Sequence, residues 1–190
     1  MSTNQRNEMH LENLLESVPA YAKDLKLNLS SVTSQTELTK EQTWGTAVAS
    51  VVASRNAEMI IAILDEAGKH ISSQAIEAAK AAAAIMGMNN IYYRFHHLSK
   101  NEKYATLPAR LRMNVIRTHG VDPVDFELWC VAVSAINACG KCVDAHERVL
   151  REKGVSEETI NAAIRIASVI HGLAVVFDTE RVAAGQTVSA

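Results

Sequence analysis

The chain has 190 residues, a formal net charge of −2, and a composition that is 48% hydrophobic and 5% aromatic. This length suits one domain of ordinary size, and the small charge, with no run of Lys or Arg forming a basic stripe, argues against a nucleic-acid partner. The start lacks the apolar region and cleavage pattern of a signal peptide. We expect no later segment to be apolar for the length that a bilayer requires. We therefore expect a cytoplasmic protein with no membrane partner.

Helical spacing recurs along most of the first half, and no strictly alternating run framed by turn residues indicates a strand. Apolar residues at helical spacing predict a first helix within 11–18, and the stretch 27–38, LNLSSVTSQTEL, is typical of a loop. Thr39, with Gln42 three residues later, predicts a capping box at the start of a helix over 40–55.

Further helices are expected over 57–68 and 74–88, with a short one over 89–95. Residues 96–123 contain two prolines and a glycine as breakers, so we expect an irregular connection there. Beyond it, the sequence predicts one helix over 125–137, a second that ends at Gly154, and a long third helix capped by Ser156. The expected fold class is all-α.

Two halves of the sequence resemble each other at a spacing of 85 residues. Trp44 and Trp129 each open a helix of small residues, and the tripeptide Ile-Met-Gly at 85–87 recurs as Ile-His-Gly at 170–172. Similar composition of Ala-rich helices is the alternative explanation. We predict one internally duplicated helical bundle, with a first repeat over about 10–95, a connection over about 96–123 and a catalytic repeat over about 124–184. At this spacing the first repeat has Ser54, Ala57 and Ile61 where the second has Cys139, Cys142 and His146.

The stretch NACGKCVDAH, residues 137–146, places two cysteines three residues apart and a histidine four residues after the second. In a reducing compartment a CxxC is more often catalytic or metal-binding than a structural disulfide. A redox dithiol, a zinc site and mere packing of polar residues are the three interpretations. A zinc site would use Cys139, Cys142 and His146, with His171 or Glu127 as the fourth ligand.

Helix geometry favours a reactive thiol at Cys142. If the helix begins near Asn137 or Ala138, both cysteines lie in reach of a disulfide and beside unpaired N–H groups that stabilise a thiolate. His146 lies one turn after Cys142, so its imidazole is expected to lean back over the sulfur as a base. Glu127 is either the carboxylate that orients this imidazole or an acid placed by the helix dipole.

The stretch FELWCVAVSAINACGKCVDAHERVLREKGVSEETI, with WGTAVAS, AAAAIMGMNN and RLRMNVI upstream, resembles the AhpD alkyl hydroperoxidase family of the carboxymuconolactone decarboxylase-like superfamily. The resemblance runs from about Leu14 to Phe177. It implies an all-helical, internally duplicated fold that is usually a homotrimer in close relatives. It also implies a thiol-dependent hydroperoxidase with no bound cofactor, which works beside the peroxiredoxin AhpC and takes electrons from dihydrolipoamide on a lipoyl domain.

By this resemblance Cys142 is the peroxide-reactive thiol, and Cys139 donates a proton and closes the redox disulfide with Cys142. His146 and Glu127 form the relay that deprotonates Cys142. One departure is Lys141, because close relatives often carry His immediately before the second cysteine. A lysine lowers a thiol pKa by its charge but does not shuttle protons near neutrality, so no role of that His is carried over.

Other candidate residues are expected to have packing roles. Cys130, Met86 and His171 are assigned to the core on composition and helical position. A zinc-binding protein, or a helical oxidant sensor whose disulfide forms without turnover, is the alternative to the enzyme.

Overall fold

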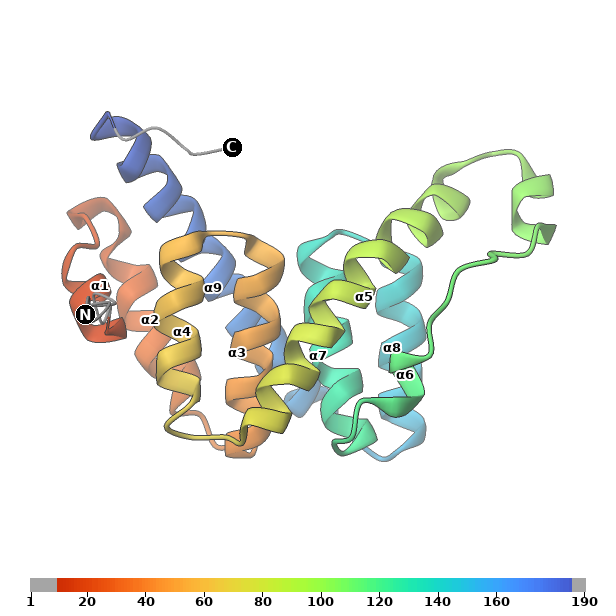
Figure 1. The fold of residues 1–190 in the computed structure, drawn as a ribbon, viewed down its shortest axis with the longest axis horizontal. Helices are drawn as coiled ribbons and strands as arrows, with labels where there is room; N and C mark the ends of the chain where they lie inside the picture. Colours follow the sequence, from red (N-terminus) through yellow and green to blue (C-terminus); the bar gives the residue numbers. More distant parts are fainter. Residues whose placement is uncertain (1–9, 186–190) are drawn as a thin grey trace, which may run out of the picture.

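The computed structural model describes residues 10–185, which fold into helices with one long connection between α5 and α7 (Figure 1). The described part contains no strand, which confirms the predicted all-α class. Residues 1–9, which begin the stretch expected to lack signal-peptide features, lie outside the described part. The elements are α1 (Leu11–Glu16), η1 (Ala20–Ala22), α2 (Lys23–Thr33), α3 (Lys40–Ser54), α4 (Ala57–Ala67), α5 (Ser73–Leu98), η2 (Glu102–Thr106), α6 (Val115–Thr118), α7 (Pro123–Ile136), α8 (Gly140–Glu152) and α9 (Glu157–Ala183), with η marking 3-10 turns.

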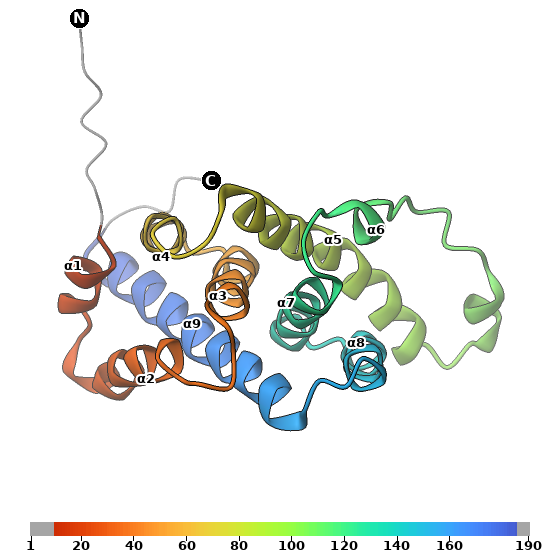
Figure 2. The ribbon, with the colours of Figure 1, turned by 90° about the horizontal axis from the view of Figure 1, so that it is seen from below.

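The centre of the fold is the pair α3 and α7, which lies between the long helices α5 and α9 (Figure 2). Every residue of α3 from Thr43 to Val51 is buried, and most of these side chains are small. The helix begins at the predicted capping box, in which the Thr39 hydroxyl accepts from the Gln42 N–H and the Gln42 side chain accepts from the Thr39 N–H. Small side chains let neighbouring helices approach closely, so α3 can contact α5, α7 and α9 together.

Gly45 on α3 lies directly against the Trp129 indole on α7. A Cβ at Gly45 would overlap indole atoms, and Trp129 is fully buried, so the ring has no room to withdraw. We expect Gly45→Ala to lower the free energy of unfolding by about 1–3 kcal/mol, the usual cost of overpacking, in a denaturant titration. Gly87→Ala in α5 is the control, because its added Cβ meets nothing within 4 Å. There, helix propensity favours Ala by about 1 kcal/mol. A Gly45→Ala protein as stable as the parent would contradict the packing argument.

Two expected boundaries are wrong. The stretch 27–38 was expected to be a loop, but its first part belongs to α2, whose Leu29 and Val32 are buried in the core. The separate helices expected over 74–88 and 89–95 are one helix, α5. In both places, burial against neighbouring helices outweighs the local preference of Ser and Asn for turns.

The expectation that no segment is apolar over a bilayer's length is also wrong. By length and composition, α9 would be able to cross a membrane, yet 61% of its most apolar 18-residue window is buried inside the fold. Its buried residues pack against α2, α3 and α7. The apolar composition of α9 is therefore that of a helix buried in the core.

The helix order α3–α4–α5 recurs as α7–α8–α9. Their first residues are 83, 83 and 84 positions apart, slightly less than the spacing of 85 between the sequence landmarks. The N-cap of α4 is Asn56 and that of α8 is Cys139. When the two repeats are aligned by their helix starts, Cys139 therefore corresponds to Asn56 and not to Ser54. The division into two repeats stays a prediction.

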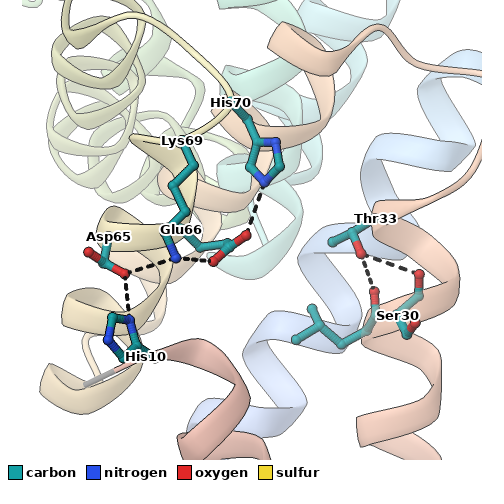
Figure 3. A network of polar contacts seen from close by, with 8 residues as sticks. His10, Ser30, Thr33, Asp65, Glu66, Lys69 and His70 are labelled. Atoms are coloured by element: carbon teal, nitrogen blue, oxygen red, sulfur yellow. Dashed lines mark hydrogen bonds and ion pairs between the residues drawn. The ribbon is translucent and has the colours of Figure 1, made fainter. Parts of the chain in front are cut away.

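A polar network far from the cysteines connects α1 to α4 (Figure 3). His10, just before α1, lies 3.4 Å from Asp65, and Lys69 contacts both Asp65 and Glu66. Glu66 also contacts His70, whose ring stacks on Trp44 at 4.4 Å. Because most of these charges are solvent-accessible, each pair contributes little stability.

Candidate active site

Cys139 stands where α7 ends and α8 begins. Ala138 has a left-handed φ of 54°, and the N–H groups of Ala138 and Cys139 donate to the carbonyl oxygens of Ala135 and Ser134. This is a Schellman motif, which closes α7 and makes Cys139 the N-cap of α8. The helix starts at Gly140, two or three residues later than the sequence suggested.

Both thiols of the motif are free and buried, with 0% of Cys139 and 5% of Cys142 exposed. The N–H groups of Cys142 and Val143 donate to the Cys139 carbonyl oxygen at 3.0 and 2.9 Å, so Cys142 lies within the first turn of α8. The Cys142 Sγ lies 4.0 Å from the carbonyl oxygen of Asn89 on α5. Both cysteines therefore lie at the N-terminus of α8, and the Cys142 sulfur also contacts α5.

The surroundings of Cys142 favour the neutral thiol. Burial raises its pKa to about 12, the contact with the Cys139 thiol adds to the rise, and the Asn90 side chain and the Lys141 charge oppose it. An easily ionised Cys142 was expected from its place at the helix N-terminus. In the resting reduced protein, desolvation of the thiolate outweighs that contribution.

This pKa predicts an unusual titration. An ordinary thiol ionises near pH 8.5, whereas we expect the Cys142 thiolate absorbance to appear only as the pH approaches about 12. The Cys142 pKa is higher in the folded protein than in the unfolded one, so the folded protein keeps the proton to a higher pH. Its contribution to stability is complete below the ordinary thiol pKa and is lost as the pH rises toward the folded-state value. The free energy of unfolding should therefore fall more between about pH 9 and pH 12 in the parent than in Cys142→Ser. A thiolate signal below pH 8 that is missing from Cys142→Ser would contradict this assignment.

Glu127 and His146 meet at the same place. The Nδ1 atom of His146 on α8 lies 2.6 Å from Oε2 of Glu127 on α7, and both side chains are mostly buried. Nδ1–H thus donates to the carboxylate, which fixes the ring and leaves Nε2 to face the other way. This contact has the geometry expected of a carboxylate that orients the imidazole.

Nε2 of His146 was expected to face the Cys142 sulfur, but it faces Met86 instead. Nε2 lies 3.2 Å from Sδ of Met86 on α5. Met86 was expected to be a core residue, and it is 1% exposed, but it also contacts the imidazole. Nothing in the sequence signals this contact, because the two residues are 60 positions apart.

Cys142 and His146 open into one pocket with a volume of about 270 Å³. Its walls come from α5, α8 and the segment around α6, and most of its surface is apolar. Sequence reasoning had not assigned the α5 and α6 residues of this wall, because only packing brings those segments to the cysteines. The lining residues are Met86, Asn89, Tyr93, Met113, Ile116, Lys141, Cys142, Ala145 and His146.

A buried polar network supports the corner at Cys139. The Asn90 side chain donates to the Ser134 hydroxyl at 3.0 Å and accepts from the Asn137 side chain at 2.9 Å. Arg94 donates to the Asn137 carbonyl oxygen at 2.6 Å. These bonds connect α5 to the end of α7, so they hold Asn137, which lies two residues before Cys139. No pattern in the sequence indicates these contacts.

Of the two fourth ligands that the zinc interpretation offers, Glu127 contacts His146, whereas His171 lies elsewhere. Nδ1 of His171 lies 3.2 Å from the Ser54 hydroxyl and borders a different pocket from that of Cys142. Within residues 10–185, no group of three or more His, Cys, Asp or Glu side chains is arranged to hold a metal ion. Cys130 is buried, and burial raises the pKa of its thiol well above the ordinary value.

Comparison with known proteins places this site in a family. The model of the carboxymuconolactone decarboxylase family matches residues 102–184, which include all four candidate residues. The chain is 66% identical over 172 residues to a Solibacter usitatus protein, with 90% of this chain and 97% of the relative covered. It is 61% identical over 175 residues to one from Acidobacterium capsulatum, with 92% and 96% covered. It is 54% identical over 170 residues to one from Brucella melitensis, with 90% and 97% covered. All three relatives carry the name alkyl hydroperoxide reductase AhpD. The chain therefore belongs to the AhpD family.

Proposed function

We propose that this chain is a thiol-dependent alkyl hydroperoxide reductase whose redox dithiol is Cys139 and Cys142. The observation that supports this most is the shared apolar pocket, into which the Cys142 thiol opens beside the His146–Glu127 pair. An apolar pocket suits an organic hydroperoxide, whose alkyl group loses water on binding. The relatives' names agree with this reaction class.

The proposed reaction has three balanced steps. The Cys142 thiolate attacks the distal oxygen of the hydroperoxide, the O–O bond breaks, Cys142 becomes a sulfenic acid, and the alkoxide takes a proton and leaves as the alcohol. The Cys139 thiol then attacks the Cys142 sulfur, so that a disulfide forms and water leaves. Finally, dihydrolipoamide transfers two electrons to the disulfide by thiol–disulfide exchange and leaves as oxidised lipoamide.

The first step needs a base, because a thiol with a pKa of about 12 is ionised in only about one molecule in 10⁵ at pH 7. His146 is the proposed base, with Glu127 stabilising the imidazolium that forms. Nε2 would have to turn from Met86 toward Cys142 or reach it through one water. Such hydrogen bonds often tighten only when the substrate is bound.

We also assign a physiological setting to this reaction. The protein would act in the cytoplasm beside the peroxiredoxin AhpC, with a lipoyl-domain protein as electron donor and a homotrimer as the assembly. The reducing compartment suits two free thiols in a CxxC motif. Reduction of a disulfide on AhpC would use the same dithiol as direct peroxide reduction.

A survey of electron donors tests this proposal. Dihydrolipoamide, thioredoxin and glutathione are each supplied with an alkyl hydroperoxide, with and without AhpC, and peroxide consumption is followed. We expect catalytic consumption with dihydrolipoamide. Turnover that appears only when AhpC is present would assign the chain to peroxiredoxin reduction. If the disulfide forms but no donor supports turnover under either condition, the enzyme is excluded and the oxidant sensor is favoured.

A further inference from the structure

Asn89 is a buried polar residue in the wall of the Cys142 pocket. It is 4% exposed, and it lies on α5 between Met86 and Tyr93, which line the same pocket. Because residues three and four positions apart share one face of a helix, these three residues form a single stripe on the side of α5 that borders the pocket. The Asn89 carbonyl oxygen lies 4.0 Å from the Cys142 Sγ, so the residue lies beside the proposed peroxide-reactive sulfur.

The side-chain amide of Asn89 has no hydrogen-bond partner among residues 10–185, although its Oδ1 atom is buried. The amide of the next residue, Asn90, is satisfied at both ends, by Ser134 and Asn137. Burial of an unsatisfied polar group lowers stability, so such a group in a native structure requires an explanation, of which a catalytic role is one. The packing of the fold does not explain why Asn89 is polar.

The amide of Asn89 is also free to turn. Rotation about its Cβ–Cγ bond exchanges Oδ1 with Nδ2 in almost the same volume, and no hydrogen bond is lost. Other polar side chains of the wall are already engaged. The His146 ring lies between Glu127 and Met86, and Nζ of Lys141 lies over an aromatic ring, 5.8 Å from its centre. Asn89 can therefore offer either an N–H group or a carbonyl oxygen to a bound molecule.

A hydroperoxide group matches what this amide offers. The group R–O–O–H has one donor and two acceptor oxygens, while its alkyl part R suits the mostly apolar wall of the pocket. When the O–O bond breaks, negative charge develops on the oxygen that leaves. A hydrogen-bond donor held at that oxygen, in a pocket that excludes water, lowers the barrier of the reaction.

We propose that the Asn89 amide binds the peroxide group of the substrate and donates from Nδ2 to the oxygen that leaves. This inference rests on the proposed function and adds a catalytic residue to it. As the Cys142 thiolate attacks the distal oxygen, the S–O bond forms, the O–O bond breaks, and the electron pair of that bond stays on the alkoxide beside Asn89. The alkoxide then takes the proton that His146 accepted from Cys142, and it leaves as the alcohol.

Single-turnover oxidation of the reduced protein by cumene hydroperoxide tests this role. We expect Asn89→Ala to slow the oxidation of Cys142 by about 10²- to 10³-fold, the usual loss when one such donor is removed. Alkylation of Cys142 by iodoacetamide at the same pH, followed by mass spectrometry, should keep the parent's rate. That reaction breaks no O–O bond, and the proposed base is still present. A residue that acted on the thiol or through His146 would slow both reactions.

Unfolding measurements separate the proposed role from a role in packing. Asn89→Ala removes an unsatisfied polar group, so its denaturation midpoint should equal or exceed that of the parent. Asn90→Ala is the matched comparison on the same helix. It should lower the midpoint, because it leaves Ser134 and Asn137 without their hydrogen-bond partner.

Three results would overturn the role of Asn89 and leave the proposed function intact. They are oxidation of the Asn89→Ala protein at the parent's rate, equal slowing of oxidation and alkylation, and a denaturation midpoint lowered as much as in Asn90→Ala. By contrast, a parent protein that cumene hydroperoxide does not oxidise at Cys142 would refute the proposed function itself.

Discussion

Cys142→Ser should abolish peroxide reduction, whereas Cys139→Ser should reduce about one equivalent of hydroperoxide and then stop. The difference follows from the site, because Cys142 lines the pocket together with His146, whereas Cys139 is not among the lining residues. Without Cys139 the sulfenic acid on Cys142 lacks its proposed resolving thiol. The Cys130 thiol also interacts with Cys142, but burial raises its pKa well above the ordinary value, so it is a poor nucleophile. The sulfenic acid should therefore persist and react with a sulfenic-acid probe. The measurements are burst stoichiometry and mass spectrometry of the probe adduct.

Cys130→Ala is the control for these variants. Cys130 is buried, does not border the pocket, and has a thiol whose pKa is raised by burial, so its loss should leave turnover intact. One equivalent of peroxide consumed by Cys142→Ser, but not by Cys139→Ser, would reverse the two roles. Full turnover in both variants would remove the dithiol from the reaction altogether.

Loss of the imidazole should produce the next largest effect. We expect His146→Ala to lower kcat/KM for the hydroperoxide by about 10²- to 10⁴-fold, the usual contribution of a general base. Activity should then require a higher pH, because the Cys142 thiol must ionise without a proton acceptor and its pKa is about 12. Glu127→Gln should have a smaller effect in the same direction, since an amide can still accept from Nδ1–H but lacks the negative charge.

Two variants on α8 serve as controls for the relay. Lys141→Ala removes only a charge that lowers the Cys142 pKa, so it should reduce the rate much less than His146→Ala. Asp144→Asn changes an exposed carboxylate on the same helix and should have almost no effect. If Lys141→Ala proves the more damaging change, His146 is not the base. If His146→Ala leaves the pH profile unchanged, its contact with Glu127 is structural only.

The sequence by itself determined the helical class and most helix ends, because these depend on contacts within a few residues. The Thr39–Gln42 capping box, the Ser156 cap and the left-handed Gly154 after α8 are all present where the sequence predicts them. The sequence also predicts both cysteines at the start of one helix, and Cys139 is the N-cap of α8 with Cys142 in its first turn. Local hydrogen bonding and backbone geometry are sufficient for all of these features.

Only the tertiary structure decided how the candidate site is arranged, because burial and contacts between distant segments depend on helix packing. The sequence left Glu127 with two roles, and the packing of α7 against α8 places it 2.6 Å from His146. Helix position alone suggested an easily ionised Cys142, but cover from α5 makes desolvation the larger effect and raises its pKa. The same packing puts Met86 against the imidazole and brings α6 to the pocket, and no local pattern encodes either contact.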